Sequence, residues 1–565
     1  MGVAISRYSE LGSNELLMRF CSTEVISPND PFWNQMLSYN ITPPATSQEQ
    51  LIFDSSMESL LQTFLQNNLQ TGNLGSLLQV FITRASILLA SPNSDKYMLF
   101  TRRRNNSAFF FFRDNTYFLH LECINAILVL MSVYMFAGVH VCMVCIVYIL
   151  VFQNVFLKYL FSAASVWNMI SFATPARRSI FSNPPIDRHE LLERLKTEHP
   201  IANQSCLLLL TLANHCINED NLYRKALLSC EDNLHKALCA TAGCEHSTLL
   251  LYLMLHSCKA YKRYVSQVPQ IEDLVIPILQ VLYNAPDSSS HHIYMSLIVI
   301  LILTEDDSLI KSVHTIMLKN LTWYTERAIS EISLGGLMVL VIIRALQYNM
   351  ARGRDKYLHT NCAAAIANMS CEFRNLHPYV AQRLISLFET LTKRRNRLCA
   401  QIEGDFSITW QTPKNVSITP FTYLTVLDEV IRMLLEIINS CLTHQLPHNL
   451  NVVYALLHKR KLFSDPRHQP QAQNIEMVIG YFSSRLQRVQ EGVGGELGVT
   501  EVLACIKKGA EQWSSDRLKK FPDLKFKYVE EERPEEFFTP YVWALSSTCG
   551  GVHWASEGGK TDVFW

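Results

Sequence analysis

The stretch HTNCAAAIANMS, residues 359–370, gathers small side chains on what its pattern predicts to be a single helix. These small residues are Cys362, Ala363, Ala364, Ala365 and Ala367. Small side chains let a second helix axis approach closely, so we expect this helix to lie inside a stack, covered by neighbouring helices. The stretch is typical of an inner helix in a protein built from paired helices.

Other apolar runs support this interpretation. They are SCLLLLTLAN at 205–214, TLLLYLMLH at 248–256, IYMSLIVILIL at 293–303 and ISLGGLMVLVII at 332–343. Each covers about two to three helical turns, whereas a helix that spans a bilayer needs roughly 20 apolar residues. Helices that are apolar on all sides are usually buried between other helices, and we expect that environment here.

Amphipathic helices are predicted nearer the C-terminus. Residues 426–441, VLDEVIRMLLEIINSC, carry apolar side chains at helical spacing on one face. The stretch HNLNVVYALLHKRKLF at 448–463 is expected to be the antiparallel partner of that helix. Alternation with a period of two is rare, and no β-hairpin is predicted.

These patterns resemble armadillo or HEAT repeats, in which stacked helix pairs form one continuous core. The predicted fold is therefore all-α, an α-solenoid of degenerate armadillo/HEAT-like helix pairs, with about two or three pairs between 288 and 391. The expected organisation is an N-terminal helical region (1–92), an atypical segment (93–200), a central helical-repeat region (201–399), a linker (400–425) and a C-terminal helical region with a tail (426–565).

Bulk composition limits the class of protein. At 565 residues the chain is too long for one compact core unless it forms a repeat stack or several modules. Its 50 basic and 50 acidic residues give a formal net charge of zero, which argues against binding to nucleic acid. The 16 cysteines follow no repeating frame, as expected for buried thiols in a reducing compartment. No cleavable signal peptide is expected, because acidic residues interrupt the first 30 positions.

One long segment departs from the rest of the chain. Residues 123–157 contain no Asp, Glu, Lys or Arg, and a second apolar run follows at 159–173. Together, residues 124–173 could anchor an integral membrane protein as a re-entrant hairpin. They could instead form a buried helix pair, or derive from a faulty gene model, and all three interpretations stay open.

The chain begins MGVAIS, which matches the pattern M-G-x-x-x-[ST] for N-myristoylation of Gly2. A single myristoyl chain gives only marginal membrane binding, with a constant on the order of 10⁴ M⁻¹. We therefore expect a second membrane signal, supplied by the apolar segment, by a basic patch at 393–397 (KRRNR) or by a bound protein.

Three stretches resemble known catalytic or nucleotide-binding motifs, but each lacks a required residue at the required position. SEGGKTD at 556–562 has Trp554 where a phosphate-binding loop needs its first glycine, and GVGGELG at 492–498 has Leu497 where a dinucleotide-binding loop needs its third. HELLE at 189–193 has Glu193 where a zinc protease needs a second histidine. We expect no catalytic and no cofactor-binding residues.

Three clusters and one mixed segment are better explained by structure than by chemistry. Cys230, His235, Cys239, Cys244 and His246 have irregular spacings, so no metal site is expected. The carboxylates of TEDDS at 304–308 are expected in a solvated loop after a helix, and KRRNR at a solvated helix end. The segment KKFPDLKFKYVEEERPEEFF at 519–538 is expected to be a docked terminal segment or a protein-binding surface.

Several long strings resemble the dymeclin family. They include EVISPNDPFWNQ at 24–35, KNLTWYTERAISEISLGGL at 319–337, YNMARGRDKYLHTNCAAAIANMS at 348–370 and DRLKKFPDLKFKYVEEERPEEFFTPYVW at 516–543. The resemblance covers most of the chain outside about 93–200. It implies a non-enzymatic peripheral protein on the cytosolic face of the Golgi apparatus, also present in the cytoplasm, that takes part in Golgi organisation and vesicle traffic. It also implies N-myristoylation, with the family's N-terminal glycine at Gly2. The apolar segment does not align with the family, and the intervening region is shorter than in the family.

Overall fold

The computed structural model describes residues 11–38, 47–80, 200–215, 233–404, 419–519 and 521–551, except for 78, 469, 494–496, 523 and 531–532, together with isolated positions between 83 and 197. The chain divides into two compact units, Met1–Cys123 and Ile124–Trp565. The apolar runs at 123–157 and 159–173 lie outside the described residues, apart from Ile124, Asn125 and Leu128.

The first unit is helical in its described part. Asn14 begins its second helix, because the Asn14 side-chain oxygen accepts hydrogen bonds from the main-chain N–H groups of Leu16 and Leu17 at 3.0 and 3.1 Å. Trp33 and Ile26 are fully buried in its core. Its elements are η1 (Leu11–Ser13), α2 (Glu15–Cys21), α3 (Phe32–Ser38) and α4 (Ser47–Thr71).

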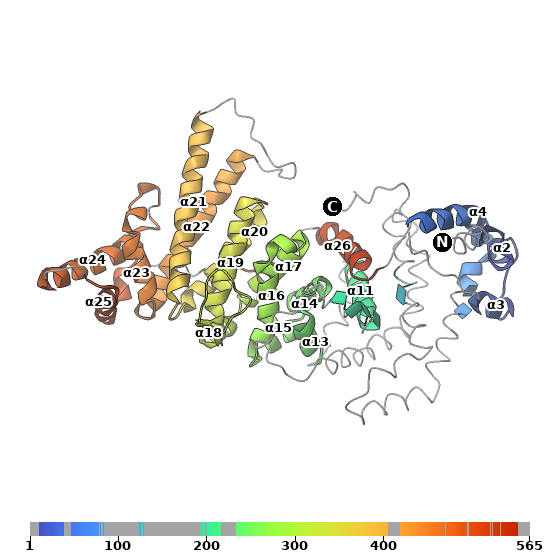
Figure 1. Ribbon diagram of the computed structural model, residues 1–565, viewed down its shortest axis with the longest axis horizontal. Helices are drawn as coiled ribbons and strands as arrows, with labels where there is room; N and C mark the ends of the chain where they lie inside the picture. The colour runs from blue at the N-terminus through green and yellow to red at the C-terminus, as the bar shows by residue number, and fades with distance from the viewer. Residues whose placement is uncertain are drawn as a thin grey trace, which may run out of the picture. The chain divides into compact units, whose positions relative to one another are not determined.

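The second unit is also predominantly helical, which confirms the predicted all-α class (Figure 1). The first helices in its described part are α11 (Pro200–His215), α13 (Asn233–Thr241), α14 (Glu245–Ser257), α15 (Lys259–Gln267), α16 (Glu272–Tyr283), α17 (Ser290–Leu303) and α18 (Asp307–Thr315). They are followed by α19 (Leu334–Ala351), α20 (Lys356–Met369), α21 (Pro378–Gly404), α22 (Pro420–Gln445), α23 (Leu450–His458), α24 (Gln473–Val493), α25 (Val499–Glu511) and α26 (Pro534–Thr548).

Polar residues fix where several of these helices begin. Ser289, Asp306, Ser333, Asp355 and Thr419 each precede a helix and accept a hydrogen bond from a main-chain N–H of its first turn. Such caps satisfy N–H groups that have no partner inside the helix. The apolar runs therefore become helices with defined starting points.

Each inner helix is covered on several sides. Helix α16 packs against α17 and α19, α17 against α14 and α20, and α20 against α19 and α22. In α17 every residue from Ile293 to Leu303 except Tyr294 is buried. Helix α19 is the one described helix long and apolar enough to cross a membrane, and 78% of its apolar window is buried inside the protein.

The stretch at 359–370 forms the predicted inner helix. Ala363 and Ala365 of α20 are fully buried, and Ala364 is 5% exposed. Because these side chains are small, α17, α19 and α22 can all lie against α20. The prediction that an inner helix forms here is confirmed.

Two predictions about secondary structure are wrong. A short antiparallel pair, β1 (Met317–Lys319) and β2 (Glu331–Ser333), is present although no hairpin was predicted. Three-residue strands are too short for alternation to be visible in a sequence. Helix α23 packs against α21, α24 and α25, and is not the main partner of α22, which packs against α20 and α21.

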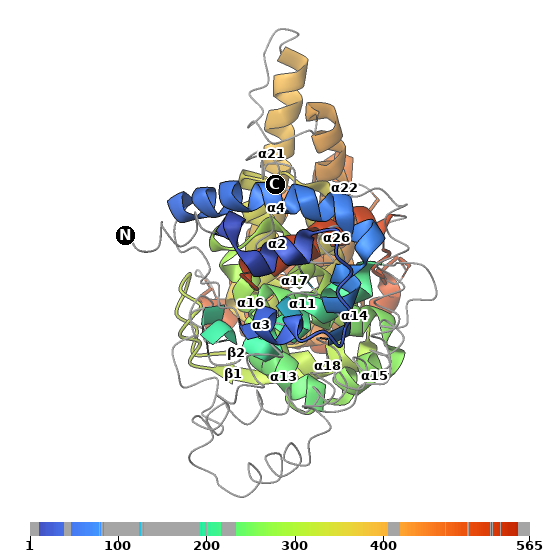
Figure 2. The same cartoon turned by 90° about the vertical axis from the view of Figure 1, so that its right-hand side faces the viewer.

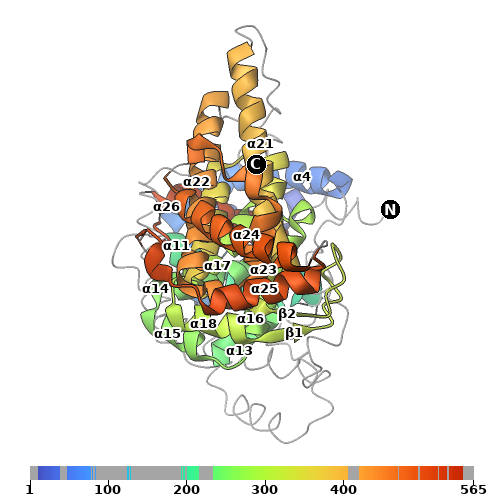
Figure 3. The ribbon, with the colours of Figure 1, turned by 90° about the vertical axis from the view of Figure 1, so that its left-hand side faces the viewer.

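The ends of the second unit differ in character. Helices α21 and α22 form a hairpin that projects beyond the neighbouring helices (Figure 2). Figure 3 looks onto the end formed by α23, α24 and α25. Both ends of the predicted linker at 400–425 are helical, since α21 continues to Gly404 and α22 begins at Pro420, and residues 405–418 lie outside the described part.

The last helix lies far from the helices that precede it in sequence. Helix α26 packs on α11 and α14, away from α24 and α25 (Figure 1). Asn203 of α11 donates a hydrogen bond of 2.9 Å to the Cys549 carbonyl, and Gln204 donates one to the Gly550 carbonyl. Helix α26 and the residues that follow it therefore cover α11, more than 300 positions earlier in the chain.

A glycine allows close contact between α18 and α19. A Cβ atom at Gly335 would lie 2.5 Å from the imidazole of His314, so a larger residue could not fit without movement. The His314 ring is 7% exposed and packs edge-on against Phe373 at 5.5 Å. Burial, aided by Arg374, lowers the pKa of His314 to about 4.

Adding volume to α20 should destabilise the stack. Ala365→Leu inserts three carbon atoms into a packed interior and should lower the free energy of unfolding by about 1–3 kcal/mol, as measured by urea denaturation. Ala351→Leu at an exposed position on α19 makes the same change outside the core and should alter that free energy by less than about 0.5 kcal/mol. Equal effects would contradict the inner position of α20.

Burial of His314 should make stability depend on pH. The unfolded side chain takes up a proton near pH 6.5 and the folded one only near pH 4. The free energy of unfolding therefore keeps its full value above pH 6.5. It decreases by about 3 kcal/mol as the pH falls toward 4, because only the unfolded chain takes up the proton in this range. In His314→Leu, the drop in unfolding free energy between pH 7 and 4.5 should shrink by about that amount. The exposed His448, changed to Leu, is the control and should leave the drop unchanged.

Candidate functional site

The predicted lipidation residue lies outside the described part of the chain. Gly2 belongs to residues 1–10, which the structure does not describe, so its acylation stays a prediction. The candidate site within the described residues is the surface where the C-terminal segment crosses the helices of the second unit. Two further networks, around Asn73 and around 393–397, also involve residues that the sequence singled out.

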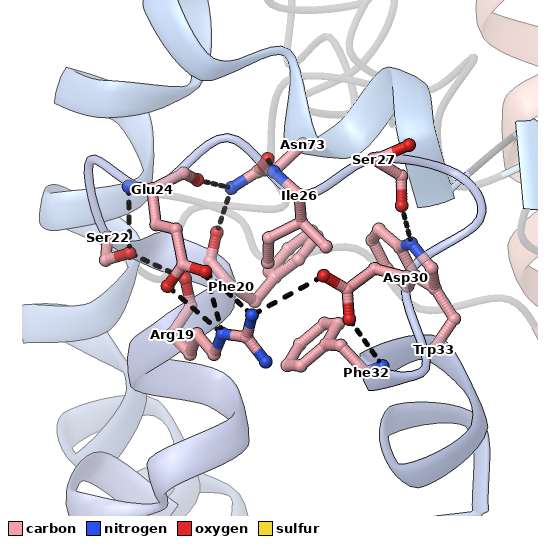
Figure 4. A network of polar contacts seen from close by, with 10 residues as sticks. All are labelled: Arg19, Phe20, Ser22, Glu24, Ile26, Ser27, Asp30, Phe32, Trp33 and Asn73. Carbon is pink, nitrogen blue, oxygen red and sulfur yellow. Dashed lines mark hydrogen bonds and ion pairs between the residues drawn. The ribbon is translucent and has the colours of Figure 1, made fainter.

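The loop after α2 is held by a buried amide (Figure 4). The Asn73 side chain accepts a hydrogen bond from the Ile26 N–H at 2.8 Å and donates to the carbonyls of Phe20 and Glu24 at 3.1 and 2.8 Å. Asn73 has no exposed surface. The Asn73 side chain therefore satisfies three main-chain groups, at the end of α2 and in the loop after it, that no hydrogen bond within a helix can satisfy.

Charged residues complete this network (Figure 4). Arg19 contacts Glu24 at 2.7 Å and Asp30 at 3.6 Å, and the hydrogen bond from Arg19 lowers the pKa of Glu24. The Trp33 indole N–H donates to the Ser27 carbonyl at 2.8 Å. Both contacts of Arg19 fix the loop, and a carboxylate whose pKa is lowered, as that of Glu24 is, is poorly suited to act as a general acid near neutral pH.

The C-terminal segment crosses the second unit in an extended form. Its residues 524–530, here called the extended segment, are neither helical nor part of a sheet. Leu524, Phe526, Tyr528 and Glu530 are half-buried, whereas Lys525, Lys527 and Val529 are exposed. This alternation is the pattern of an extended chain with one face against the protein.

Two asparagines hold this part of the chain by its main chain. The Asn368 amide accepts from the Phe526 N–H at 2.7 Å and donates to the Phe526 carbonyl at 2.9 Å. Asn474 does the same for Lys519, with both distances at 2.8 Å. An amide side chain both donates and accepts, so one asparagine can match both polar groups of one residue.

The acidic cluster TEDDS is part of the same surface. Glu305 accepts from the Tyr528 N–H at 2.9 Å and pairs with Lys262 at 2.5 Å. Asp307 pairs with Lys525, while Asp306 begins α18. The predicted loop after α17 is present, and Asp307 keeps 69% of its side chain exposed. The prediction missed that Glu305 and Asp307 also bind a segment more than 200 positions later in the chain.

Aromatic side chains fix the far end of the extended segment. The Tyr528 ring lies edge-on to Tyr252 and His256, with centroid distances of 5.8 and 5.7 Å. The Tyr252 hydroxyl donates to Glu530 at 2.8 Å. The segment is therefore bound by main-chain hydrogen bonds, one ion pair and ring contacts together.

The basic run at 393–397 lies inside α21 and not at a helix end, which corrects the prediction. Two of its arginines have partners: Arg395 contacts Asp428 at 2.8 Å, and the Arg394 guanidinium lies 5.7 Å from the centre of the Tyr423 ring. Arg395 also lines a cavity of about 270 Å³ beside Arg432 and Arg467. Those two arginines pair with Glu436 and Asp465, so carboxylates offset much of the local positive charge.

The cysteine and histidine cluster does not converge in the described part of the chain. His235 is hydrogen-bonded to the Tyr261 hydroxyl at 3.1 Å and to Cys239 at 3.5 Å. Cys230 lies outside the described residues. Among the residues that were described, no three His, Cys, Asp or Glu side chains are arranged to hold a metal ion.

The sequence is similar to a known family over nearly its whole length. The family model "Dymeclin: Dyggve-Melchior-Clausen syndrome protein" matches residues 1–113 and 97–545. A dymeclin from Drosophila melanogaster is 44% identical over 698 aligned positions, covering 99% of both chains, and one from Gallus gallus is 38% identical over 653, covering 96% of this chain and 97% of the relative. A dymeclin from Dictyostelium discoideum is 27% identical over 57% of this chain and 42% of its own. No solved structure matches.

The alignment also bears on the atypical segment. Its 698 positions exceed the 565 residues of this chain by 133, so at least that many positions have no residue here. The two family matches overlap at 97–113, where the atypical segment begins. This chain therefore has fewer residues than the alignment with this relative has positions, and the break between the two family matches lies at the start of the atypical segment.

Loss of Asn368 should release the extended segment. In Asn368→Ala both hydrogen bonds to Phe526 are lost, at a cost of about 1–3 kcal/mol. Amide hydrogen exchange at Phe526 and Tyr528, measured residue by residue, should become at least about tenfold faster. Asn361→Ala, at a half-buried position on the same helix, is the control and should leave exchange at both residues unchanged. The same exchange rates in both variants would show that Asn368 does not hold the segment.

Proposed function

The chain belongs to the dymeclin family, and on that premise we propose that it is a non-enzymatic scaffold or adaptor, peripherally bound to the cytosolic face of the Golgi apparatus. In this role it takes part in Golgi organisation and vesicle traffic, as the resemblance to the family implies. Part of the protein is bound to the membrane and part is free in the cytoplasm. The Golgi membrane and protein partners are its ligands, and no cofactor or nucleic acid is part of the proposal.

The observation that supports a scaffold is the order in which the helices pack. Helices α14, α16, α17, α19, α20 and α22 contact one another in a progression along the chain. We assign this progression to an α-solenoid of degenerate armadillo/HEAT-like pairs, a fold that presents a long outer surface for its size. An extended surface suits a protein whose task is to hold other proteins in place.

The chemistry of the polar residues in the second unit fits this role. Asn368 and Asn474 each use both functions of their amide on one main-chain residue, and Glu305 is occupied by Tyr528 and Lys262. The buried polar groups at this surface therefore hold the chain in place. A catalytic role for these residues would need them to be free to meet a substrate.

Attachment to the membrane is proposed to have two parts. Gly2 carries a myristoyl group, and a second contact adds to its marginal affinity. Arg395 of the basic run and the neighbouring Arg432 and Arg467 are paired with carboxylates. This pairing weakens the basic run as a source of the second contact and favours the apolar segment or a bound protein.

The alternative is an integral membrane protein anchored through residues 124–173. It is favoured by one feature of the sequence, the absence of charged side chains from 123 to 157. Extraction of cell membranes with alkaline carbonate separates the two proposals. A peripheral protein is released, whereas an inserted one stays in the membrane pellet.

Removal of Gly2 should abolish lipid attachment. In cells given labelled myristate, Gly2→Ala should incorporate no label, and a larger fraction of the protein should be soluble after cell fractionation. Val3→Ala retains the acceptor glycine and is the control, with labelling and Golgi staining like those of the unchanged protein. Equal labelling of Gly2→Ala and Val3→Ala would refute acylation at Gly2.

A further inference from the structure

Within the described residues, the main-chain hydrogen bonds of the extended segment lie along one of its edges. Phe526 uses its N–H and C=O on Asn368, and Tyr528 uses its N–H on Glu305. In an extended chain the N–H and C=O groups of successive residues point to opposite edges. The main-chain groups of Lys525, Lys527 and Val529 must therefore point to the other edge.

That other edge carries no hydrogen bonds within the described part of the chain. The main-chain N–H and C=O groups of Lys525, Lys527 and Val529 have no partner among the described residues. All three residues are exposed, and Val529 keeps 81% of its surface accessible to solvent. An exposed edge with free N–H and C=O groups is a template on which a further strand can pair.

The segment is ordered before any such strand arrives. Asn474 holds Lys519 on one side, and α26 is packed on α11 on the other. Between them, Asn368 and the ring contacts of Tyr528 fix the main chain. Because no entropy must be spent on ordering this strand, addition of a partner strand costs less than it would for a flexible tail.

The exposed side chains of this edge define the chemistry of a partner. Lys527 forms no ion pair with any described residue, while Lys525 already contacts Asp307. Two positions further along the same face is the apolar Val529. Opposite charges and apolar pairs between neighbouring strands are stabilising, and like charges are destabilising.

We propose that the outer edge of residues 525–529 is a docking site for an extended, acidic segment of a partner protein. The partner adds as a β-strand, with a carboxylate beside Lys527 and an apolar side chain beside Val529. This interaction goes beyond the proposed function and does not depend on Gly2 or on a membrane, so the two can fail separately.

The test uses the full chain in solution and a fluorescein-labelled heptapeptide, Ser-Glu-Thr-Val-Ser-Glu-Thr, whose second, fourth and sixth side chains share one face of a strand. Fluorescence anisotropy should show saturable binding of this peptide. A second peptide, with lysines in place of both glutamates, should bind at least about tenfold more weakly. Absence of saturable binding, or equal binding of both peptides, would overturn the proposal.

Variants of Lys527 separate the main-chain and side-chain contributions. Lys527→Pro removes the outward N–H and suits an extended chain, whereas Lys527→Ala removes only the charge. The proline variant should bind the acidic peptide at least tenfold more weakly than the alanine variant. Lys527→Glu should reverse the preference in favour of the lysine peptide.

Two results would contradict strand addition. They are equal binding by Lys527→Pro and Lys527→Ala, and an unchanged preference in Lys527→Glu. Circular dichroism and thermal melting of each variant check that the fold is intact. Because residue 527 makes no bond to the helices within the described part, all three variants should melt like the unchanged protein.

Discussion

Main-chain groups outside the helices need partners, and here buried asparagine side chains supply them. A helix uses its own N–H and C=O groups, so its surface can offer only side chains to a segment that lies across it. Asn73 meets this need in the first unit, and Asn368 and Asn474 meet it in the second. Without those amides the loop after α2 and the extended segment would leave polar main-chain groups unmatched against apolar helices.

Two of the strings that resemble the dymeclin family, at 24–35 and at 516–543, contain segments that these asparagines or their neighbours hold in place. Both combine aromatic, charged and proline residues, which makes them distinctive as sequences. A helix core tolerates exchange among Leu, Ile and Val, whereas a docked non-helical segment must fit particular partners. It follows that the easily recognised strings in this protein mark docking surfaces as well as the helical core.

Local patterns in the sequence predict much of this fold. The alanines of 363–367, the apolar run of 293–303 and the face of 426–441 all lead to helices that are buried where expected. What they cannot reveal is pairing between distant parts of the chain. The TEDDS carboxylates lie next to a helix end in the sequence, but their partners, Tyr528 and Lys525, are more than 200 residues away. The packing of α26 on α11 is a second example, because the two helices are more than 300 residues apart and no local pattern indicates that they meet. The alternation of apolar residues and lysines at 524–528 was the available signal for the extended segment, and it is broken at Val529, which is apolar but exposed.

The position of α26 on α11 has a consequence for how the protein is made. Ribosomes release a chain from its N-terminus, at about 5–20 residues per second, so α11 emerges hundreds of residues before the helix that covers it. Until residues 534–548 have left the exit tunnel, α26 cannot cover its face of α11. During that time chaperones or temporary contacts must shield this face from water. A premature stop codon close to the end of the message would thus damage the middle of the chain, and such a product would be expected to enter degradation although it contains nearly every helix.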